Sequence, residues 1–97
     1  MPINVELRNE NGNAIYVLEG VYLTSAHVPD FNDTRYPYLR LIDPYGDTIF
    51  SRYQMVAVLP ELEALVRERH LPELQAVLEL AQRCASEVHT YLAFLGD

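Results

Sequence analysis

Few side chains in this sequence have the type and spacing that catalysis requires, and His89 is the strongest candidate. It lies in an apolar, β-branched segment near the C-terminus and could act as a general base if a carboxylate lay beside it. Asp43 and Asp47 bracket a turn and could supply that carboxylate; otherwise Asp43 accepts backbone hydrogen bonds within its turn and Asp47 is solvated. We expect no catalytic residue, and we keep a ligand or minor enzyme site at His89 and Tyr91, used with either aspartate, as an alternative.

The sequence lacks the common motifs for binding metals and cofactors. The chain has a single cysteine, which excludes cysteine-based zinc sites, and its three histidines are far apart in sequence. Asp30–Asp33 begins like a calcium loop, but Thr34 and Arg35 stand where a ligand and the required glycine should be. The four glycines cannot form a dinucleotide or phosphate-binding fingerprint. We therefore expect no metal and no cofactor.

The charge balance bears on the kind of partner. Fourteen acidic residues stand against seven arginines, lysine is absent, and the formal net charge is −7. Such a surface opposes approach to a phosphate backbone and attracts a basic protein. No stretch approaches the roughly 20 apolar residues that span a bilayer, and the N-terminus alternates apolar and polar residues, unlike a signal peptide. With the lone Cys84, these features favour a cytoplasmic protein that binds neither nucleic acid nor membrane.

Tyrosines and arginines gather between residues 35 and 53, and this group is the best functional lead in the chain. Both residue types dominate the energetics of protein interfaces. They are also ordinary cross-strand partners on a sheet, so a purely structural role stays open. With the neighbouring aspartates, the predicted docking residues are Tyr36, Tyr38, Arg40, Asp43, Tyr45, Asp47 and Arg52.

Alternation of apolar and polar residues predicts the strands. Ile3–Arg8 alternates with period two, and an Asn-Gly turn leads to a returning strand at Ala14–Leu18. Val21–Tyr38 is rich in proline, aspartate and asparagine and is predicted to be mostly loop. Tyr38–Asp43 and Asp47–Tyr53 flank a Pro-Tyr-Gly turn and predict a second hairpin. We expect the docking residues to lie on that hairpin.

Helical periodicity follows from Gln54 onward. Apolar residues at helical spacing predict one helix ending near Leu71, with Pro60 either in its first turn or at a kink, and a second helix opening at Pro72. Val88–Leu95 is apolar on both faces and predicts a covered or central strand. The expected fold is a single α+β domain over residues 1–97, ordered ββ-ββ-αα-β. Its mostly antiparallel sheet has about five strands, with two antiparallel helices on one face. The predicted common core comprises Leu62, Leu65, Val77, Leu78, Leu92 and Phe94.

Four short segments carry a resemblance. Residues 41–50, read as IDPYGDTxF from Ile42, are followed by Arg52, and the chain closes with Phe94-Leu95-Gly96-Asp97. Together with Arg83-Cys84 and the segment 87–92, they resemble a group of small uncharacterised bacterial proteins over roughly the C-terminal 60 residues of the chain. The resemblance implies bacterial origin and a compact stand-alone domain. It implies no activity, and no functional residue is carried over from it.

These observations favour a small acidic protein-binding module, such as an immunity- or antitoxin-like inhibitor of a basic partner. Two alternatives stay open. One is the small-molecule binder or minor enzyme at His89, and the other is a homo-oligomeric structural protein, for which a homodimer is the simplest form. A deep pocket containing His89 would favour the first alternative, and a flat aromatic surface would favour docking.

Overall fold

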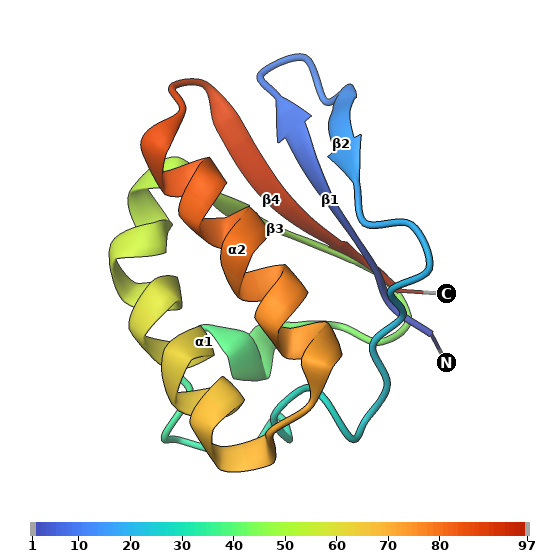
Figure 1. Cartoon of the computed structure of the whole chain (residues 1–97), viewed down its shortest axis with the longest axis vertical. Helices are drawn as coiled ribbons and strands as arrows, with labels where there is room; N and C mark the ends of the chain where they lie inside the picture. Colours follow the sequence, from blue (N-terminus) through green and yellow to red (C-terminus); the bar gives the residue numbers. More distant parts are fainter. Residues whose placement is uncertain (1, 97) are drawn as a thin grey trace.

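The computed structural model describes residues 2–96, which form an antiparallel sheet with two helices on one of its faces (Figure 1). The class is α+β, as predicted. The sheet has four strands in the order β2-β1-β4-β3, and the prediction of about five was one too many. The strands are β1 (Asn4–Asn9), β2 (Ala14–Val17), β3 (Asp47–Ser51) and β4 (Thr90–Leu95).

Most of the core residues that the sheet contributes lie on its two central strands, β1 and β4. On β1, Val5 and Leu7 are fully buried, and they pair with Phe94 and Leu92 of β4. The neighbour on the opposite face of β4, Ala93, is also fully buried, because β1 and β3 flank this strand on both sides. The prediction that the last strand lies in the middle of its sheet is confirmed, since β4 pairs with β1 along one edge and with β3 along the other.

The predicted second hairpin is wrong. Residues Leu39–Leu41 form a short 3₁₀ helix, η1, and β3 pairs with β4 instead. Two tertiary interactions override the alternating pattern: Leu39 and Ile42 both turn into the core, and the buried carboxylate of Glu61 accepts the Leu39 amide hydrogen bond at 2.9 Å. The turn before β3 is nevertheless present, because the Gly46 amide donates to the Asp43 carbonyl.

The helices are α1 (Met55–Arg69) and α2 (Pro72–Ser86). A second 3₁₀ helix, η2 (Arg52–Gln54), leads into α1, and Pro60 lies inside α1 rather than in its first turn. Helix α1 ends at His70, which adopts a left-handed conformation (φ 54°), and Pro72 opens α2 at a first-turn position that needs no amide donor.

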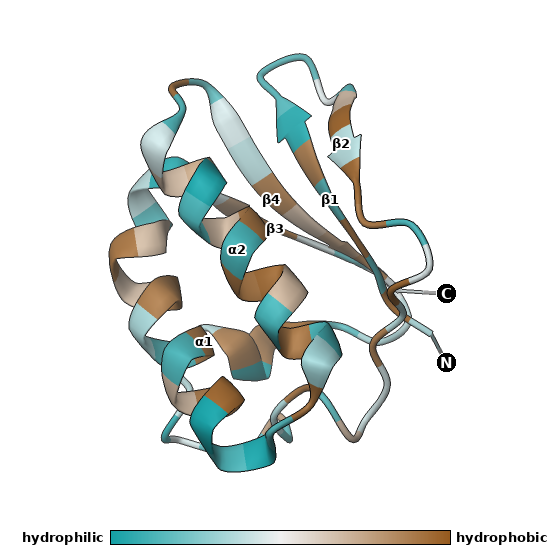
Figure 2. Ribbon diagram, viewed as in Figure 1, coloured by the Kyte–Doolittle hydropathy of each residue, from teal (hydrophilic) through white to brown (hydrophobic). Residues whose placement is uncertain are grey.

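The predicted common core is confirmed. All six of its residues belong to one buried cluster that joins the inward faces of α1 and α2 to the sheet. Figure 2 shows hydrophobic residues on both helices and along β4, with hydrophilic residues between them. Within residues 2–96, neither helix combines the length and the apolar character needed to cross a membrane.

Candidate functional site

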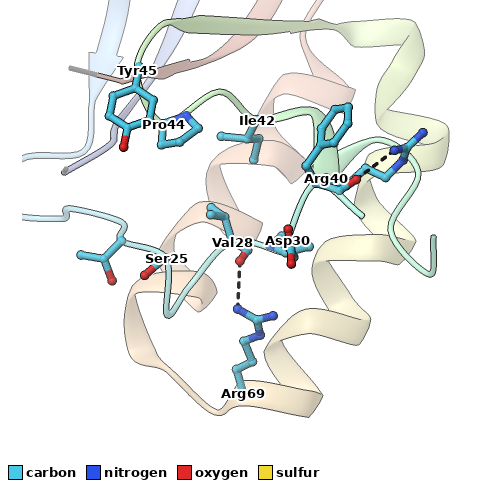
Figure 3. Close-up of a pocket in the computed structure, with 11 residues that line it drawn as sticks. Ser25, Val28, Asp30, Arg40, Ile42, Pro44, Tyr45 and Arg69 are labelled. Atoms are coloured by element: carbon cyan, nitrogen blue, oxygen red, sulfur yellow. Dashed lines mark hydrogen bonds between the residues drawn. The ribbon is translucent and has the colours of Figure 1, made fainter. Parts of the chain in front are cut away.

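A cavity of about 650 Å³ opens between two loop segments and the end of α1 (Figure 3). We call it the loop cavity. One side is formed by Ile42, Pro44 and Tyr45, and the other by Ser25, Val28 and Asp30 (Figure 3). It is thus apolar along one wall and carries a hydroxyl and a carboxylate along the other. The remaining lining residues are Thr24, Pro29, Phe31, Arg40 and Arg69.

Two arginines hold the polar wall in place. The Arg69 guanidinium, at the end of α1, donates from Nη1 to the carbonyls of Ala26 and Val28 at 2.9 and 3.0 Å. Arg40 donates from Nη1 to the Phe31 carbonyl at 2.9 Å, and its guanidinium carbon lies 5.3 Å from the centre of the Phe31 ring. The structure therefore places Arg40 at the cavity, as a tether for this loop.

His27 anchors the same loop to α2. Its ring is buried, and Nδ1 accepts a hydrogen bond of 2.9 Å from the Thr24 backbone amide. An amide can only donate, so Nδ1 carries no proton and Nε2 is the donor to Glu73 Oε1 at 3.0 Å. This hydrogen bond is the first cause of a lowered Glu73 pKa. Because both ring nitrogens are occupied, His27 is not a free base for Ser25.

The apolar wall ends at a turn that is pinned from several sides. The Tyr45 amide donates to Asp43 Oδ1 at 2.9 Å, and the Gly96 amide donates to the Gly46 carbonyl at 2.8 Å. This confirms the interpretation of Asp43 as a turn acceptor. A Cβ at Gly96 would lie 2.5 Å from the Pro44 carbonyl carbon, so only glycine permits this approach. The Tyr45 side chain is 71% exposed, as its place at the turn tip predicts.

The other predicted docking tyrosines are scaffold residues. Tyr36 is only 4% exposed, its hydroxyl donates to Glu68 Oε2 at 3.3 Å, and burial is the first cause of its raised pKa. Tyr38 is half-buried, with its ring edge-on to Phe50 at a centroid separation of 6.3 Å. The expectation that Tyr36 forms part of an exposed surface is therefore wrong, because its side chain is buried and its hydroxyl bonds to Glu68 of α1.

Two further docking candidates lie away from the loop cavity. Asp47 is exposed at the start of β3. Arg52 is half-buried in η2, with its guanidinium carbon 5.7 Å from the centre of the Tyr53 ring. Its Nε is buried and has no hydrogen-bond partner among residues 2–96. The structure thus divides the predicted docking residues and brings only Arg40 and Tyr45 to the cavity wall, with Asp43 beneath the turn.

The structure does not bring His89 together with either aspartate. Asp47 pairs with Leu95 at one end of β4, whereas His89 precedes Thr90 at the other end. His89 instead lies near Glu10, with 3.4 Å between Nδ1 and Oε2. The hollow that His89 and Tyr91 line has a volume of about 140 Å³, which is small beside the 300–1,000 Å³ of ordinary ligand sites. The site proposed from His89 with Asp43 or Asp47 is not formed.

Sequence reasoning missed the loop that forms the polar wall. From the sequence, His27 is one of three histidines too far apart to form a metal site, and the segment around it is predicted to be mostly loop. The partner of His27, Glu73, lies 46 residues further along the chain, and no local pattern marks the pair. Likewise, the two residues whose carbonyls accept from Arg69 precede it by 43 and 41 positions in the sequence. The signal in the sequence was the length of the predicted loop, since long irregular segments are uncommon in compact domains and are often functional. In the structure Leu23 and Pro29 of this loop are buried against the domain.

A hydroxyl–imidazole contact lies at the loop cavity. Thr24 Oγ1 lies 3.2 Å from His27 Nδ1, but that nitrogen also accepts from the Thr24 backbone amide, and Nε2 is bonded to Glu73. No group of three or more histidine, cysteine, aspartate or glutamate side chains in residues 2–96 could hold a metal ion. No protein-family model, curated protein or solved structure matches the chain.

Proposed function

We propose that this protein is a protein-binding module that receives a basic segment of a partner in the loop cavity. The observation that carries the proposal is the position of Tyr45, an aromatic ring 71% exposed on a pinned turn at the cavity edge. Tyrosine combines a large contact area with few rotatable bonds, and exposed tyrosines of this kind dominate the energetics of many interfaces.

Both walls of the cavity are held before any partner arrives. The polar wall is tied to α1 by Arg69 and to α2 by His27. The apolar wall is tied to the C-terminal end of β4 through the contact between Gly96 and Gly46. A preorganised site gives up little conformational entropy on binding, so more of the contact energy is available as affinity.

The lining of the loop cavity has mixed charge, because Arg40 and Arg69 line it together with Asp30 and donate to loop carbonyls. A basic occupant is therefore favoured only by two carboxylates and by the net charge of the protein. Asp30, on the cavity wall, and Asp43, beside Tyr45, are exposed carboxylates, and neither forms an ion pair with any of the described arginines or histidines. A partner arginine or lysine could pack its cation on the Tyr45 ring and pair with Asp30. The net charge of −7 would steer a basic partner toward this protein.

An inhibitor of the immunity or antitoxin kind fits these properties, because it would be small, preformed and acidic toward a basic target. A cytoplasmic location is part of the proposal and is supported by the single, buried and unpaired Cys84.

The proposal is tested with a hexa-arginine peptide and a hexa-glutamate peptide titrated into ¹⁵N-labelled protein. The arginine peptide should shift the amide signals of residues 24–31 and 42–46, and the glutamate peptide should not. Tyr45→Ala should weaken binding by about 2 kcal/mol. Asp30→Asn should also weaken binding, and its difference in affinity from the wild type should grow as the salt concentration is lowered. The control is Tyr53→Ala, since Tyr53 is 81% exposed and does not line the loop cavity. Equal shifts all over the acidic surface would contradict the proposal.

A small-molecule ligand is a second candidate, favoured by the volume of the cavity. About 650 Å³ lies within the 300–1,000 Å³ range of ordinary ligand sites. A neutral compound from a fragment library that saturates the signals of residues 24–31, with an affinity that Asp30→Asn leaves unchanged, would support this candidate over protein docking.

A further inference from the structure

The second strand of the sheet, β2, is an edge strand whose composition invites pairing. It reads Ala-Ile-Tyr-Val, carries no charge, and lies at the end of the strand order. Ile15, Tyr16 and Val17 are 44%, 49% and 42% exposed. Figure 2 shows this strand as a largely hydrophobic element at the rim of the sheet, beyond the cover of the helices. Edge strands usually carry charge or proline, which prevents pairing with other chains, and β2 has neither.

The backbone of β2 has free hydrogen-bonding groups on its outer side. The Leu18 amide donates to the Val5 carbonyl at 3.1 Å, toward β1. Alternate residues of an antiparallel strand direct their backbone groups to opposite sides. The amide and carbonyl of Val17 therefore face away from β1, where no strand of the described chain lies. Water solvates both groups in a single copy, and an extended backbone can replace that water at both groups at once.

The side chains of β2 divide between the two faces of the sheet. Val17 lies opposite Glu6, on the face without helices, and Tyr16 lies opposite Leu7, on the helix face. Next to Tyr16 is a hollow of about 340 Å³ that Leu18 also lines, bounded by Leu80 and Arg83 of α2. The β-bulge in this pairing falls opposite Leu7 and Arg8, so residues 16–18 form the regular part of the edge.

We propose that β2 pairs with β2 of a second copy of this chain, antiparallel and with the two-fold axis at Val17. The amide and carbonyl of each Val17 bond to those of Val17 in the other copy. On the helix face, Tyr16 of each copy meets Leu18 of the other. Each hollow beside α2 is then closed by Tyr16 and Leu18 of the opposite copy. The result is a continuous sheet across the two copies, a closed two-fold contact in which the same surface serves both sides.

The composition around β2 favours a second copy as the occupant. An antiparallel pairing about Val17 places apolar residues opposite apolar residues at the three central positions, so the strand complements itself. On β1 the nearest carboxylate, Glu6, is paired with Arg8 at 2.6 Å. Glu79 lines the hollow on the helix face, where the guanidinium carbon of Arg83 lies 5.6 Å from the centre of the Tyr16 ring, and the exposed Glu19 follows Leu18. The apolar strand pairing must therefore outweigh repulsion between these carboxylates, so added salt should strengthen the dimer. The other edge strand, β3, begins with the exposed Asp47 and is less suited to self-pairing.

This inference shares no residue with the loop cavity, so it stands or falls separately from the proposed function. Its test is the molar mass in solution, measured by sedimentation equilibrium up to millimolar protein. The wild type should approach twice the 11.1 kDa of one chain. Val17→Lys and Val17→Glu should each remain monomeric, because they place like charges opposite each other at the axis. Mixing these two variants should restore the dimer, since lysine then faces glutamate.

The matched control is Ile49→Lys, a residue 47% exposed on the other edge strand. It should leave the dimer intact. Hydrogen exchange of the Val17 amide should slow as the protein concentration rises in the wild type and should stay fast in Val17→Lys. A monomeric wild type at millimolar concentration would overturn the proposal, as would a dimer that Ile49→Lys abolishes and Val17→Lys leaves unchanged. Failure of the mixed variants to associate would overturn the pairing about Val17.

Discussion

The carboxylate of Glu61 on α1 accepts the backbone amide hydrogen bonds of Leu39, at 2.9 Å, and of Tyr38, at 3.1 Å. Glu61 is only 8% exposed, so these bonds form largely out of contact with water. They hold the start of η1 against α1 and direct the chain into the core at Leu39. The segment that continues from η1 forms the apolar wall of the loop cavity, so Glu61 acts on the site without touching it.

Glu61→Ala should therefore destabilise the fold by about 2–3 kcal/mol, since it leaves buried amide groups without an acceptor. Glu61→Gln keeps an acceptor oxygen and should lose less. Urea denaturation measures both. The control is Glu63→Ala, an exposed residue of the same helix, which should stay within about 0.5 kcal/mol of the wild type. Equal losses at the two glutamates would contradict the role assigned to Glu61.

The packing of the two helices on the sheet predicts that truncating core side chains lowers the free energy of unfolding. Leu65 and Leu78 are 1% and 7% exposed within the common core. Replacing either with alanine should cost about 2–5 kcal/mol through lost burial and a residual cavity. Val56→Ala, on the outer face of α1 at 83% exposure, should change the melting temperature little. Thermal denaturation that shows no loss for either leucine variant would argue against this packing.

The tethers of Arg69 predict a local effect on the loop. Arg69→Gln removes the hydrogen bonds to the carbonyls of Ala26 and Val28, so hydrogen exchange should quicken at residues 26–31. Binding of the hexa-arginine peptide should weaken with it, because the polar wall is no longer preformed. Arg67→Gln is the matched control, since Arg67 is exposed on the same turn of α1. Unchanged exchange in the Arg69 variant would show that other contacts hold the loop.

The contact between His27 and Glu73 predicts a dependence of stability on pH. The Glu73 pKa lies below its ordinary value of 4.5, chiefly because His27 donates a hydrogen bond to it. A lowered folded-state pKa stabilises the protein above the unfolded value, and this stabilisation is lost as the pH falls through the folded pKa. Glu73→Gln should therefore flatten the decline in unfolding free energy as the pH falls below about 5.

The matched control for that measurement is Glu79→Gln, an exposed position on the same helix. Its decline over the same pH range should follow that of the wild type. Parallel curves for the Glu73 variant and the wild type would show that the hydrogen bond from His27 contributes nothing to acid stability.

Local patterns were sufficient for the elements that use a single periodicity. The alternation in β1 and the helical stripes of α1 and α2 are properties of consecutive residues, so the core position of Leu65 and Leu78 could be predicted from the sequence. β4 was likewise predicted to be a covered or central strand, because its consecutive residues are apolar on both faces. Pro72 marked the start of α2 through its fixed backbone angle.

The sequence by itself thus determined the class of fold, the two helices and most of the core, whereas only the tertiary structure decided the site. Residues 38–43 alternate like a strand, but Glu61, 22 residues beyond Leu39, supplies hydrogen bonds that hold them in a 3₁₀ helix. The loop cavity likewise depends on Arg69 and Glu73, which reach across more than forty residues. The free energy of such contacts comes from groups that meet only when the chain is folded, so no local pattern records them.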